Sequence, residues 1–232
     1  EVVRLRLRVG EQLVGDPVPR DPALLERFVA VTASGEEDVR GVDGTDPAGA
    51  LRVAGPGTVL VGYRSRRSPL ELPADRFEVY LAQEGLEWIS ALRAAHGESA
   101  APSREVFSRC AKSLLAGGGA GGDGFERRLG WPLEIVPEAD PASLAAAAEL
   151  PLTLLYLGEP LAGALVRARA RADPLRALTA RTDGAGRVTL RLSEPGPWLV
   201  TAVWAVEAPA GVDADWESFW ASLTFELPAA GD

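Results

Sequence analysis

The densest group of side chains that could do chemistry lies near the C-terminus, in the segment DADWESFW. Asp213, Asp215 and Glu217 alternate there, and Trp216 and Trp220 lie among them. Hard cations such as Ca²⁺ bind several carboxylate oxygens supplied by one loop. The segment therefore favours one of two structures: a ligand cluster, or an acidic loop whose aromatic rings anchor it to the fold.

Nitrogen and sulfur ligands are scarce in this chain. His96 is the only histidine and Cys110 the only cysteine among 232 residues. A zinc site needs three or four such ligands, and a catalytic thiol needs a histidine partner. We interpret Cys110 as a small buried apolar residue, and His96 as a solvated residue at the end of a helix that stops at Gly97. The identity of any metal stays unknown, and no residue is assigned to catalysis or to a cofactor.

Two further motifs have a chemical and a structural interpretation. Asp183 opens the sequence TDGAG, but Ala185 and Arg187 stand where a calcium loop would place its next ligands, so a hairpin corner is favoured. Arg64, Arg66 and Arg67 form the only basic cluster. Such a cluster could hold a carboxylate or phosphate, or could simply be a solvated strand end.

Charge and composition exclude several classes of partner. The 33 acidic residues outnumber 24 basic ones, and the net charge of −9 argues against nucleic acid and against anionic lipid surfaces. No apolar run approaches the roughly 20 residues that a membrane-spanning helix needs. The chain starts at Glu1 rather than Met. We interpret this as the result of a removed signal peptide, which predicts a periplasmic or secreted protein, with a trimmed boundary as the alternative.

The elements that must position these residues are mostly strands. Residues 1–9 alternate valine and leucine with arginine, which is typical of a half-buried strand. Short apolar runs separated by glycine and proline follow up to residue 63. Apolar residues at three- and four-residue spacing then predict an amphipathic helix over about 74–95, with Gly85 as the place for a kink. Residues 104–116 fit either a helix or a strand.

A boundary is expected where glycine dominates. Residues 117–124 are nearly all glycine, and we interpret them as a linker between two domains, 1–124 and 125–232. The second domain has about seven expected strands in about 100 residues, which is the size of an immunoglobulin-like sandwich. The predicted fold is mainly β, with two antiparallel β-sandwiches, immunoglobulin-like or prealbumin-like, and one helical segment.

Several stretches carry a family resemblance. GEPLAGALVRARA, ARTDGAGRVTLRL and PGPWLVTAVW resemble successive strands of a prealbumin-like or carboxypeptidase-regulatory-like sandwich. LRVGEQLVGDPVPRDP, FEVYLAQEGLEWI, FSRCAKSLL, LEIVPEADP and DADWESFWASLTFEL make the whole chain resemble the DUF4198 family of exported bacterial proteins. Members of that family are loosely described as periplasmic components of cobalt or nickel uptake. The family's usual His-Asp-x-Trp-like segment is absent from this sequence, and Trp204 stands where the family often has histidine.

These observations favour a non-catalytic exported binding or accessory protein over an enzyme. The resemblance implies a link to divalent nickel or cobalt, so the expected partner is a divalent metal ion or an envelope protein; no cofactor is predicted, and the oligomeric state is unknown. One alternative is a structural or adhesive module that binds protein or polysaccharide through the Trp216–Trp220 surface. A second alternative is a glycan hydrolase, which would need two carboxylates about 5–10 Å apart in a cleft.

Overall fold

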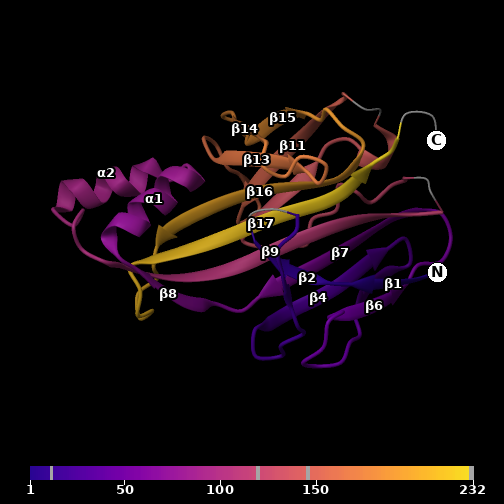
Figure 1. Ribbon diagram of the computed structural model, residues 1–232, viewed down its shortest axis with the longest axis horizontal. Coiled ribbons are helices and arrows are strands. Elements are labelled where there is room, and N and C mark those ends of the chain that lie inside the picture. Colours follow the sequence, from indigo (N-terminus) through magenta and orange to yellow (C-terminus); the bar gives the residue numbers. More distant parts are fainter. Residues whose placement is uncertain (11–12, 119–120, 145–146, 230–232) are drawn as a thin grey trace.

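Strands make up about half of this protein and are its main elements, as the alternating pattern predicts, and they form the layers of a β-sandwich (Figure 1). The computed structural model describes residues 1–10, 13–118, 121–144 and 147–229. The immunoglobulin-like form of the second half stays a prediction. In chain order the strands are β1 (Val2–Leu5), β2 (Leu7–Val9), β3 (Asp16–Val18), β4 (Leu25–Thr32), β5 (Gly35–Asp38), β6 (Gly49–Arg52), β7 (Gly57–Ser65), β8 (Ser68–Leu72), β9 (Ser103–Gly117), β10 (Leu133–Pro137), β11 (Glu149–Tyr156), β12 (Glu159–Pro160), β13 (Leu165–Ala170), β14 (Ala177–Arg181), β15 (Arg187–Arg191), β16 (Gly196–Glu207) and β17 (Trp216–Leu227).

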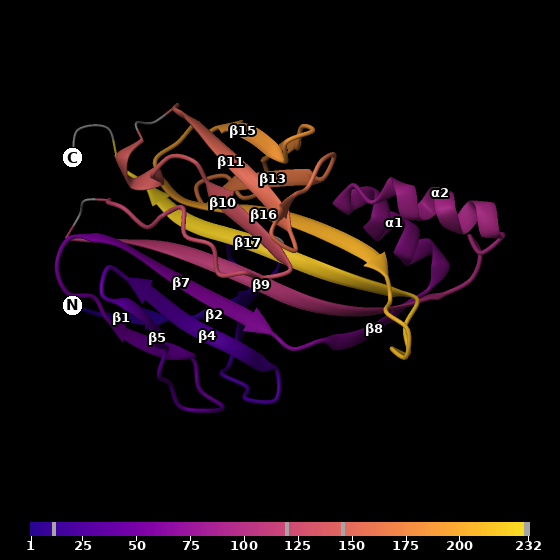
Figure 2. The ribbon, with the colours of Figure 1, turned by 180° about the vertical axis from the view of Figure 1, so that it is seen from behind.

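One nine-stranded sheet runs through both halves of the chain. Its order is β14-β13-β16-β17-β9-β7-β4-β5, and β8 also pairs with β9. The two halves meet where β17 pairs in parallel with β9, from Trp216 beside Glu105 to Thr224 beside Ser113 (Figure 2). The domain boundary at residue 124 stays a prediction. The strand pairing shows that the two proposed domains share one sheet.

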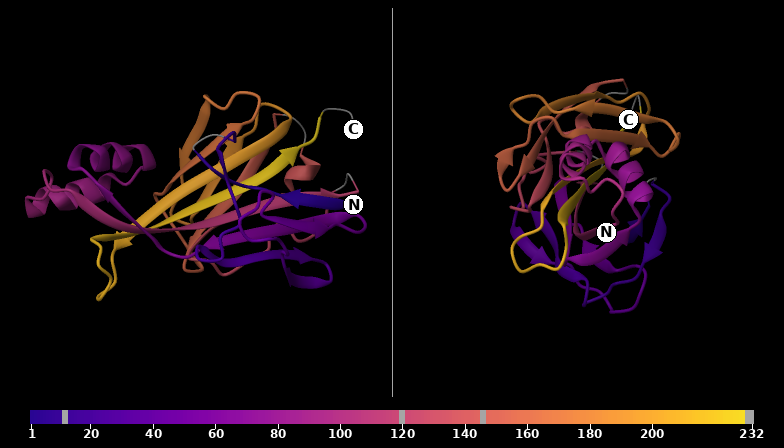
Figure 3. Two further views of the ribbon diagram at one scale, coloured as in Figure 1. Left: turned by 60° about the horizontal axis from the view of Figure 1, so that its bottom comes forward. Right: turned by 90° about the vertical axis from the view of Figure 1, so that its left-hand side faces the viewer.

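Smaller sheets cover this large sheet and enclose the cores (Figure 3). In the N-terminal half, the β1–β6 pair packs on β4 and β7 around a core that includes Phe28 and Val61. In the C-terminal half, β10, β11, β12 and β15 form a second sheet. Trp198 and Leu223 belong to the core on this side. The short 3-10 helix η1 (Pro141–Ser143) lies between β10 and β11.

The expected helical segment is confirmed, but it is two helices rather than one. α1 (Ala74–Glu84) and α2 (Glu87–His96) lie at the end of the sheet opposite to both termini (Figure 1). Gly85 separates them with a left-handed φ of 73°, a conformation that glycine adopts without a steric penalty. A Cβ at Gly85 would lie 2.6 Å from the Cβ of Leu165, so the break also lets the helices approach β13. Of the described residues, neither helix is long and apolar enough to cross a membrane.

The ambiguous segment 104–116 is strand β9. Its apolar residues fit both the helical and the strand period. The strands paired along both of its edges show that it is a strand. On one side β9 pairs first with β8 and then with β7, and on the other side it pairs with β17. β9 is therefore the central strand of the molecule.

The described part of the glycine-rich segment is held in place by hydrogen bonds. Gly117 ends β9, and residues 119–120 lie outside the described residues. The Gly122 N–H donates to the hydroxyl of Thr58 at 3.2 Å, and that hydroxyl donates back to the Gly122 carbonyl at 3.0 Å. The linker interpretation of this segment stays a prediction.

The only lysine of the chain forms a buried ion pair behind β9. Lys112 Nζ lies 3.0 Å from Glu134 Oε1 and also donates to the carbonyls of Arg127 and Ile135. The two side chains are 1% and 2% exposed. The Glu134 carboxylate also accepts the N–H groups of Leu129 and Gly130. Burial lowers the pKa of Lys112, and the Glu134 carboxylate opposes that shift. The pair thus fastens residues 127–135 to the central strand.

We expect Lys112→Met to destabilise the fold by about 3–5 kcal/mol, because it leaves the Glu134 carboxylate buried without its counter-charge. The free energy of unfolding, measured by urea denaturation at pH 7, checks this. The matched control is Arg27→Gln, which removes an ion pair between Arg27 and Glu36 whose side chains are 42% and 44% exposed. That variant should lose less than about 1 kcal/mol. Equal losses in the two variants would contradict the role of Lys112.

Candidate functional site

The two aspartates of the acidic segment are bound by one arginine from β9. Arg104 Nη1 lies 2.5 Å from Asp213 Oδ1, and Nη2 lies 3.0 Å from Asp215 Oδ1. The backbone N–H of Arg104 also donates to Asp215 Oδ2 at 2.8 Å. Burial alone would raise the pKa of Asp215, but the hydrogen bonds and charge of Arg104 outweigh it, so the pKa lies below its usual value. The structure therefore uses these carboxylates to join the start of β17 to β9.

Glu217 is bound by a second arginine, Arg67, from the turn between β7 and β8. Its two carboxylate oxygens accept from Arg67 Nε at 2.7 Å and Nη2 at 2.9 Å. Arg64, from the same basic cluster, lies 3.1 Å from Glu26, and Arg66 is exposed. The alternating acids thus do not converge on one point. Among the described residues, no three His, Cys, Asp or Glu side chains are arranged to hold a metal ion.

The aromatic residues of the segment lie between the helices and the sheet. Trp216 is 5% exposed and packs with the apolar faces of α1 and α2. Trp88 of α2 meets it edge to face, at 5.8 Å between ring centroids. Trp220 is half-buried and stacks on Tyr80 of α1, with centroids 5.7 Å apart and planes inclined by 8°. The predicted ligand cluster stays untested as a binding site, but its tryptophans serve to seat the helices.

A depression of about 480 Å³ opens beside Trp216, where α2 meets the ends of β16 and β17. Arg93 in its wall is 3% exposed and is used structurally, since its Nη2 donates to the carbonyls of Glu98 and Ala101. Glu98 and Glu207 are exposed on the rim, and no described residue forms an ion pair with either. The full lining is Leu92, Arg93, His96, Glu98, Ala101, Pro102, Glu207, Ala208, Asp215 and Trp216. The depression therefore has a mainly polar lining and an acidic rim.

A buried carboxyl without a counter-charge lies under α1, next to this depression. Glu105 of β9 is 2% exposed, and its Oε1 accepts from the Ser218 hydroxyl at 2.5 Å. Trp220 Nε1 donates to the same hydroxyl oxygen at 3.1 Å. Glu105 Oε2 and the hydroxyl of Tyr80 are buried with no hydrogen-bond partner. Burial raises the pKa of Glu105 to about 7, and the neighbouring hydroxyls of Ser218 and Tyr80 offset part of the rise. Burial raises the pKa of Tyr80 as well.

Sequence analysis missed Glu105, although a signal was present. If residues 103–109 are taken as a strand, Glu105 shares a face with Ser103, Phe107 and Arg109, so a carboxylate would stand in an inward-facing row. Glu105 stands out as an inward-facing carboxylate only if the segment is a strand. The apolar periodicity of residues 104–116 fits a helix as well.

Three other predicted features can be located. His96 is exposed at the end of α2 and lines the depression. Cys110 is buried, and burial raises the pKa of its thiol to about 11, which keeps it protonated at neutral pH. Asp183 opens a turn: its Oδ1 accepts the N–H groups of Ala185 and Arg187, which hold the pKa of the carboxyl below its usual value. Asp183 thus lies in a tight turn, but not in a hairpin, because β14 pairs with β13 and β15 pairs with β11 in the other sheet.

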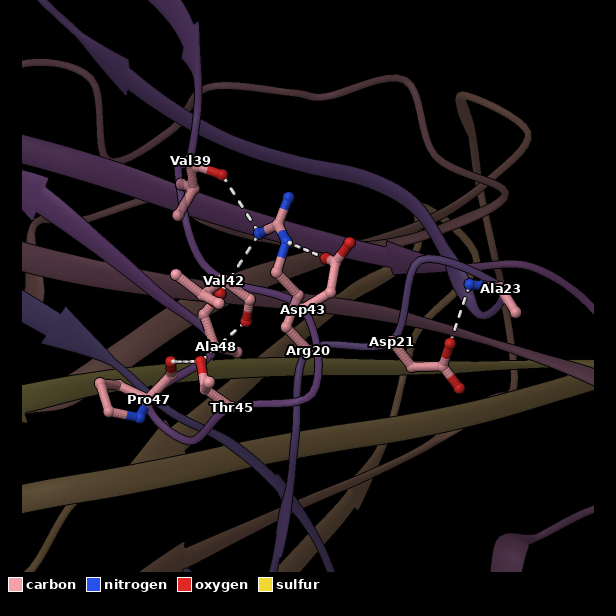
Figure 4. Close-up of polar contacts among 9 residues, drawn as sticks. All are labelled: Arg20, Asp21, Ala23, Val39, Val42, Asp43, Thr45, Pro47 and Ala48. Atoms are coloured by element: carbon pink, nitrogen blue, oxygen red, sulfur yellow. Dashed lines mark hydrogen bonds and ion pairs between the residues drawn. The ribbon is translucent and has the colours of Figure 1, made fainter.

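A second depression, beside β5, is lined by an arginine that organises a loop (Figure 4). Arg20 Nη1 donates to the carbonyls of Val39 and Ala48, both at 3.2 Å, and its Nε lies 3.3 Å from Asp43. Thr45 Oγ1 donates within the same loop to the Val42 carbonyl at 2.7 Å. The donors of Arg20 are thus directed at the loop, which makes this depression a weaker candidate for ligand binding.

The buried carboxyl predicts a pH-dependent stability. The folded-state pKa of Glu105 lies above its ordinary 4.5, so its contribution is full below pH 4.5 and is lost as the pH rises towards 7. We expect Glu105→Gln to gain about 3 kcal/mol in the free energy of unfolding, relative to the native chain, between pH 4.5 and pH 8. Urea denaturation of both proteins across this range measures the difference. Glu71→Gln, at an exposed position of β8, is the control and should show a constant difference. A constant difference in Glu105→Gln would contradict the raised pKa.

Comparison with known proteins gives a family. The model of the family described as "Domain of unknown function (DUF4198)" matches residues 1–206. No curated protein and no solved structure matches the chain. The match covers most of the sequence, from β1 into β16, and therefore includes the helices and the central strand β9. This protein belongs to the DUF4198 family.

Proposed function

We propose that this protein is a non-catalytic, exported binding or accessory protein, and that its ligand site is the depression between α2, β16 and β17. The observation that carries the proposal is a pair of exposed acids beside one depression. Glu98 and Glu207 stand on its rim without ion-pair partners among the described residues, and Leu92 and Trp216 supply the smaller, apolar part of its lining. A volume of about 480 Å³ is within the range of small-molecule sites.

This combination suits a ligand with a positive charge and an apolar body. Carboxylates on the rim attract a cation, and Leu92 in the lining offers apolar contact to the body of the ligand. Asp215 also lines the depression, but Arg104 already engages both of its oxygens. An organic amine or a basic side chain of an envelope protein therefore fits the depression better than an anion does.

The alternatives to this proposal find less support in the geometry. A glycan hydrolase needs two carboxylates that face one cleft. The acids Glu105 and Glu217 are both buried, but Glu105 pairs in register with Trp216, so Glu217 points to the opposite face of the sheet. An adhesive platform needs exposed coplanar rings, whereas Trp216 is 5% exposed. Export is proposed from the family resemblance, and fractionation of cells that express the natural gene would test it.

A nickel or cobalt ligand remains the second candidate, because the family resemblance implies it. His96, Glu98 and Glu207 offer nitrogen and oxygen donors around the same depression. No group of three such residues in the described chain is arranged to hold a metal ion. A metal would therefore need side chains to move, and an organic cation would not.

Isothermal titration calorimetry with benzyltrimethylammonium tests the proposal. We expect the native chain to bind this cation and not the neutral control benzyl alcohol. Glu207→Gln should weaken the affinity about fivefold, since one unscreened charge contact is worth about 1 kcal/mol. Glu226→Gln is the matched control, because this exposed acid lies at the far end of β17.

Parallel titrations with nickel, cobalt and calcium chloride separate the two candidates. Binding of nickel or cobalt without binding of the organic cation would replace the proposed ligand by a metal. An equal loss of affinity in Glu207→Gln and Glu226→Gln would show that binding depends on net charge rather than on the depression.

A further inference from the structure

Helix α1 covers a carboxyl group that it cannot neutralise. Glu105 has one hydrogen-bond donor, the Ser218 hydroxyl at 2.5 Å, while its second oxygen is buried without a partner. Tyr80 of α1 stacks on Trp220 above this site, and its own hydroxyl is also buried without a partner. A neutral carboxylic acid is tolerated in such a setting, whereas a buried carboxylate without a cation is costly.

The charged and titratable groups around Glu105 do not offset an ionised carboxylate. From α1 come Tyr80, which is neutral, and Glu84, whose carboxylate lies 2.7 Å from Arg167 Nη1. From β9, on the same face, comes Arg109, whose guanidinium carbon lies 5.3 Å from the Phe107 ring and 6.0 Å from the Trp220 ring.

The remaining elements contribute little. β8 places Leu70 and Leu72 on this face, and β17 places Trp216, Ser218 and Trp220 there. From α2, Arg93 is directed at the Phe77 ring and at the carbonyls of Glu98 and Ala101.

We propose that Glu105 is a proton-operated latch: its protonated form keeps α1 seated on β9 and β17, and its ionised form lifts α1 from the sheet near Tyr80. The separation lets water reach the carboxylate. Water then supplies the hydrogen-bond donors that the closed interface lacks. The pKa of Glu105, raised by burial to about 7, places this change in the neutral range.

The adjoining ends of the two helices stay attached while the latch opens. Arg181 bonds both carboxylate oxygens of Glu87, at 2.7 and 2.9 Å, and the carbonyl of Gly85. Arg167 holds Glu84. These contacts clip the turn between α1 and α2 to β13 and β14. The helices therefore swing about this turn rather than leave the sheet.

The latch also bears on the depression, and this consequence rests on the proposed function. Trp216, which lines the depression, is the strand neighbour of Glu105, and α2 forms one wall. Lifting the helices moves that wall away from Trp216. We therefore expect a ligand of the depression to bind more tightly below pH 7 than above it.

Hydrogen–deuterium exchange of the peptide that covers α1 tests the latch. After correction for intrinsic exchange, the protection of this peptide in the native chain should fall about tenfold from pH 6 to pH 8, because an open state with an ordinary carboxyl pKa gains that factor. Glu105→Gln should show no such fall, while Glu71→Gln should behave as the native chain. An equal fall in Glu105→Gln, or no fall in the native chain, would overturn the proposal.

A second variant covers the case in which Glu105→Gln does not fold. Ser218→Ala removes a donor that favours the ionised form of Glu105 in the closed interface, so the fall in protection between pH 6 and pH 8 should be larger than in the native chain. An unchanged or smaller fall would also overturn the latch.

Binding of benzyltrimethylammonium at pH 6 and pH 8 separates this proposal from the previous one. The measurement uses His96→Gln, which removes the imidazole that lines the depression. A tenfold change in exchange without any binding supports the latch and rejects the proposed ligand. Binding of equal strength at both pH values, with no change in exchange, keeps the ligand and rejects the latch.

Discussion

The position of β9 is the constraint on which the rest of the structure depends. This strand carries both halves of the large sheet, with β7 and β8 along one edge and β17 along the other. Lys112 anchors the strand from behind, through Glu134 and two carbonyl groups. A charge buried this deeply is tolerated only when its partners are fixed. These contacts therefore fix the backbone of residues 127–135. That segment leads into β10 and so positions the second sheet.

The same strand brings together groups that are far apart in the chain. Arg104 near its start holds Asp213 and Asp215, more than 100 residues away, and Glu105 contacts Ser218 on the parallel neighbour. These contacts lie at the end of the sheet that α1 and α2 cover. The acidic segment at the start of β17 thus acts as a clamp that closes the sheet beneath the helices.

Much of the fold could be predicted from local patterns, because alternation and three-to-four spacing report which face of an element is buried. The helical segment and the turn at Asp183 are examples, and Gly85 is the irregular point that its position in the pattern indicates. The pairing of the strands beside Asp183 is not an example, since β14 and β15 lie in different sheets. The segment 104–116 could not be assigned, since its apolar residues satisfy both periods and only its neighbours in the sheet decide. Long-range pairing is absent from a single sequence, so β9 was the least predictable element.

Long-range contacts also limit how far the candidate site can be predicted from the sequence. In the sequence, Asp213, Asp215 and Glu217 look like a set of metal ligands. No neighbouring residue shows that distant arginines neutralise them. In the structure Arg104 and Arg67 supply the positive charges from two different segments of the chain. The acids at the rim of the depression, which have no ion-pair partner among the described residues, have no distinctive spacing.

The proposed site and the proposed latch both lie on β9 and β17. Ligand binding and protonation of Glu105 are therefore coupled through direct neighbours. Trp216 and Glu105 are neighbours in the β9–β17 register, so the Trp216 side of the depression and the buried carboxyl move as one unit. The helices are the only part that must change position relative to that unit. Because Arg167 and Arg181 clip the turn between them, the motion is confined to the inner faces of α1 and α2, where Tyr80 covers Glu105 and Leu92 faces the depression.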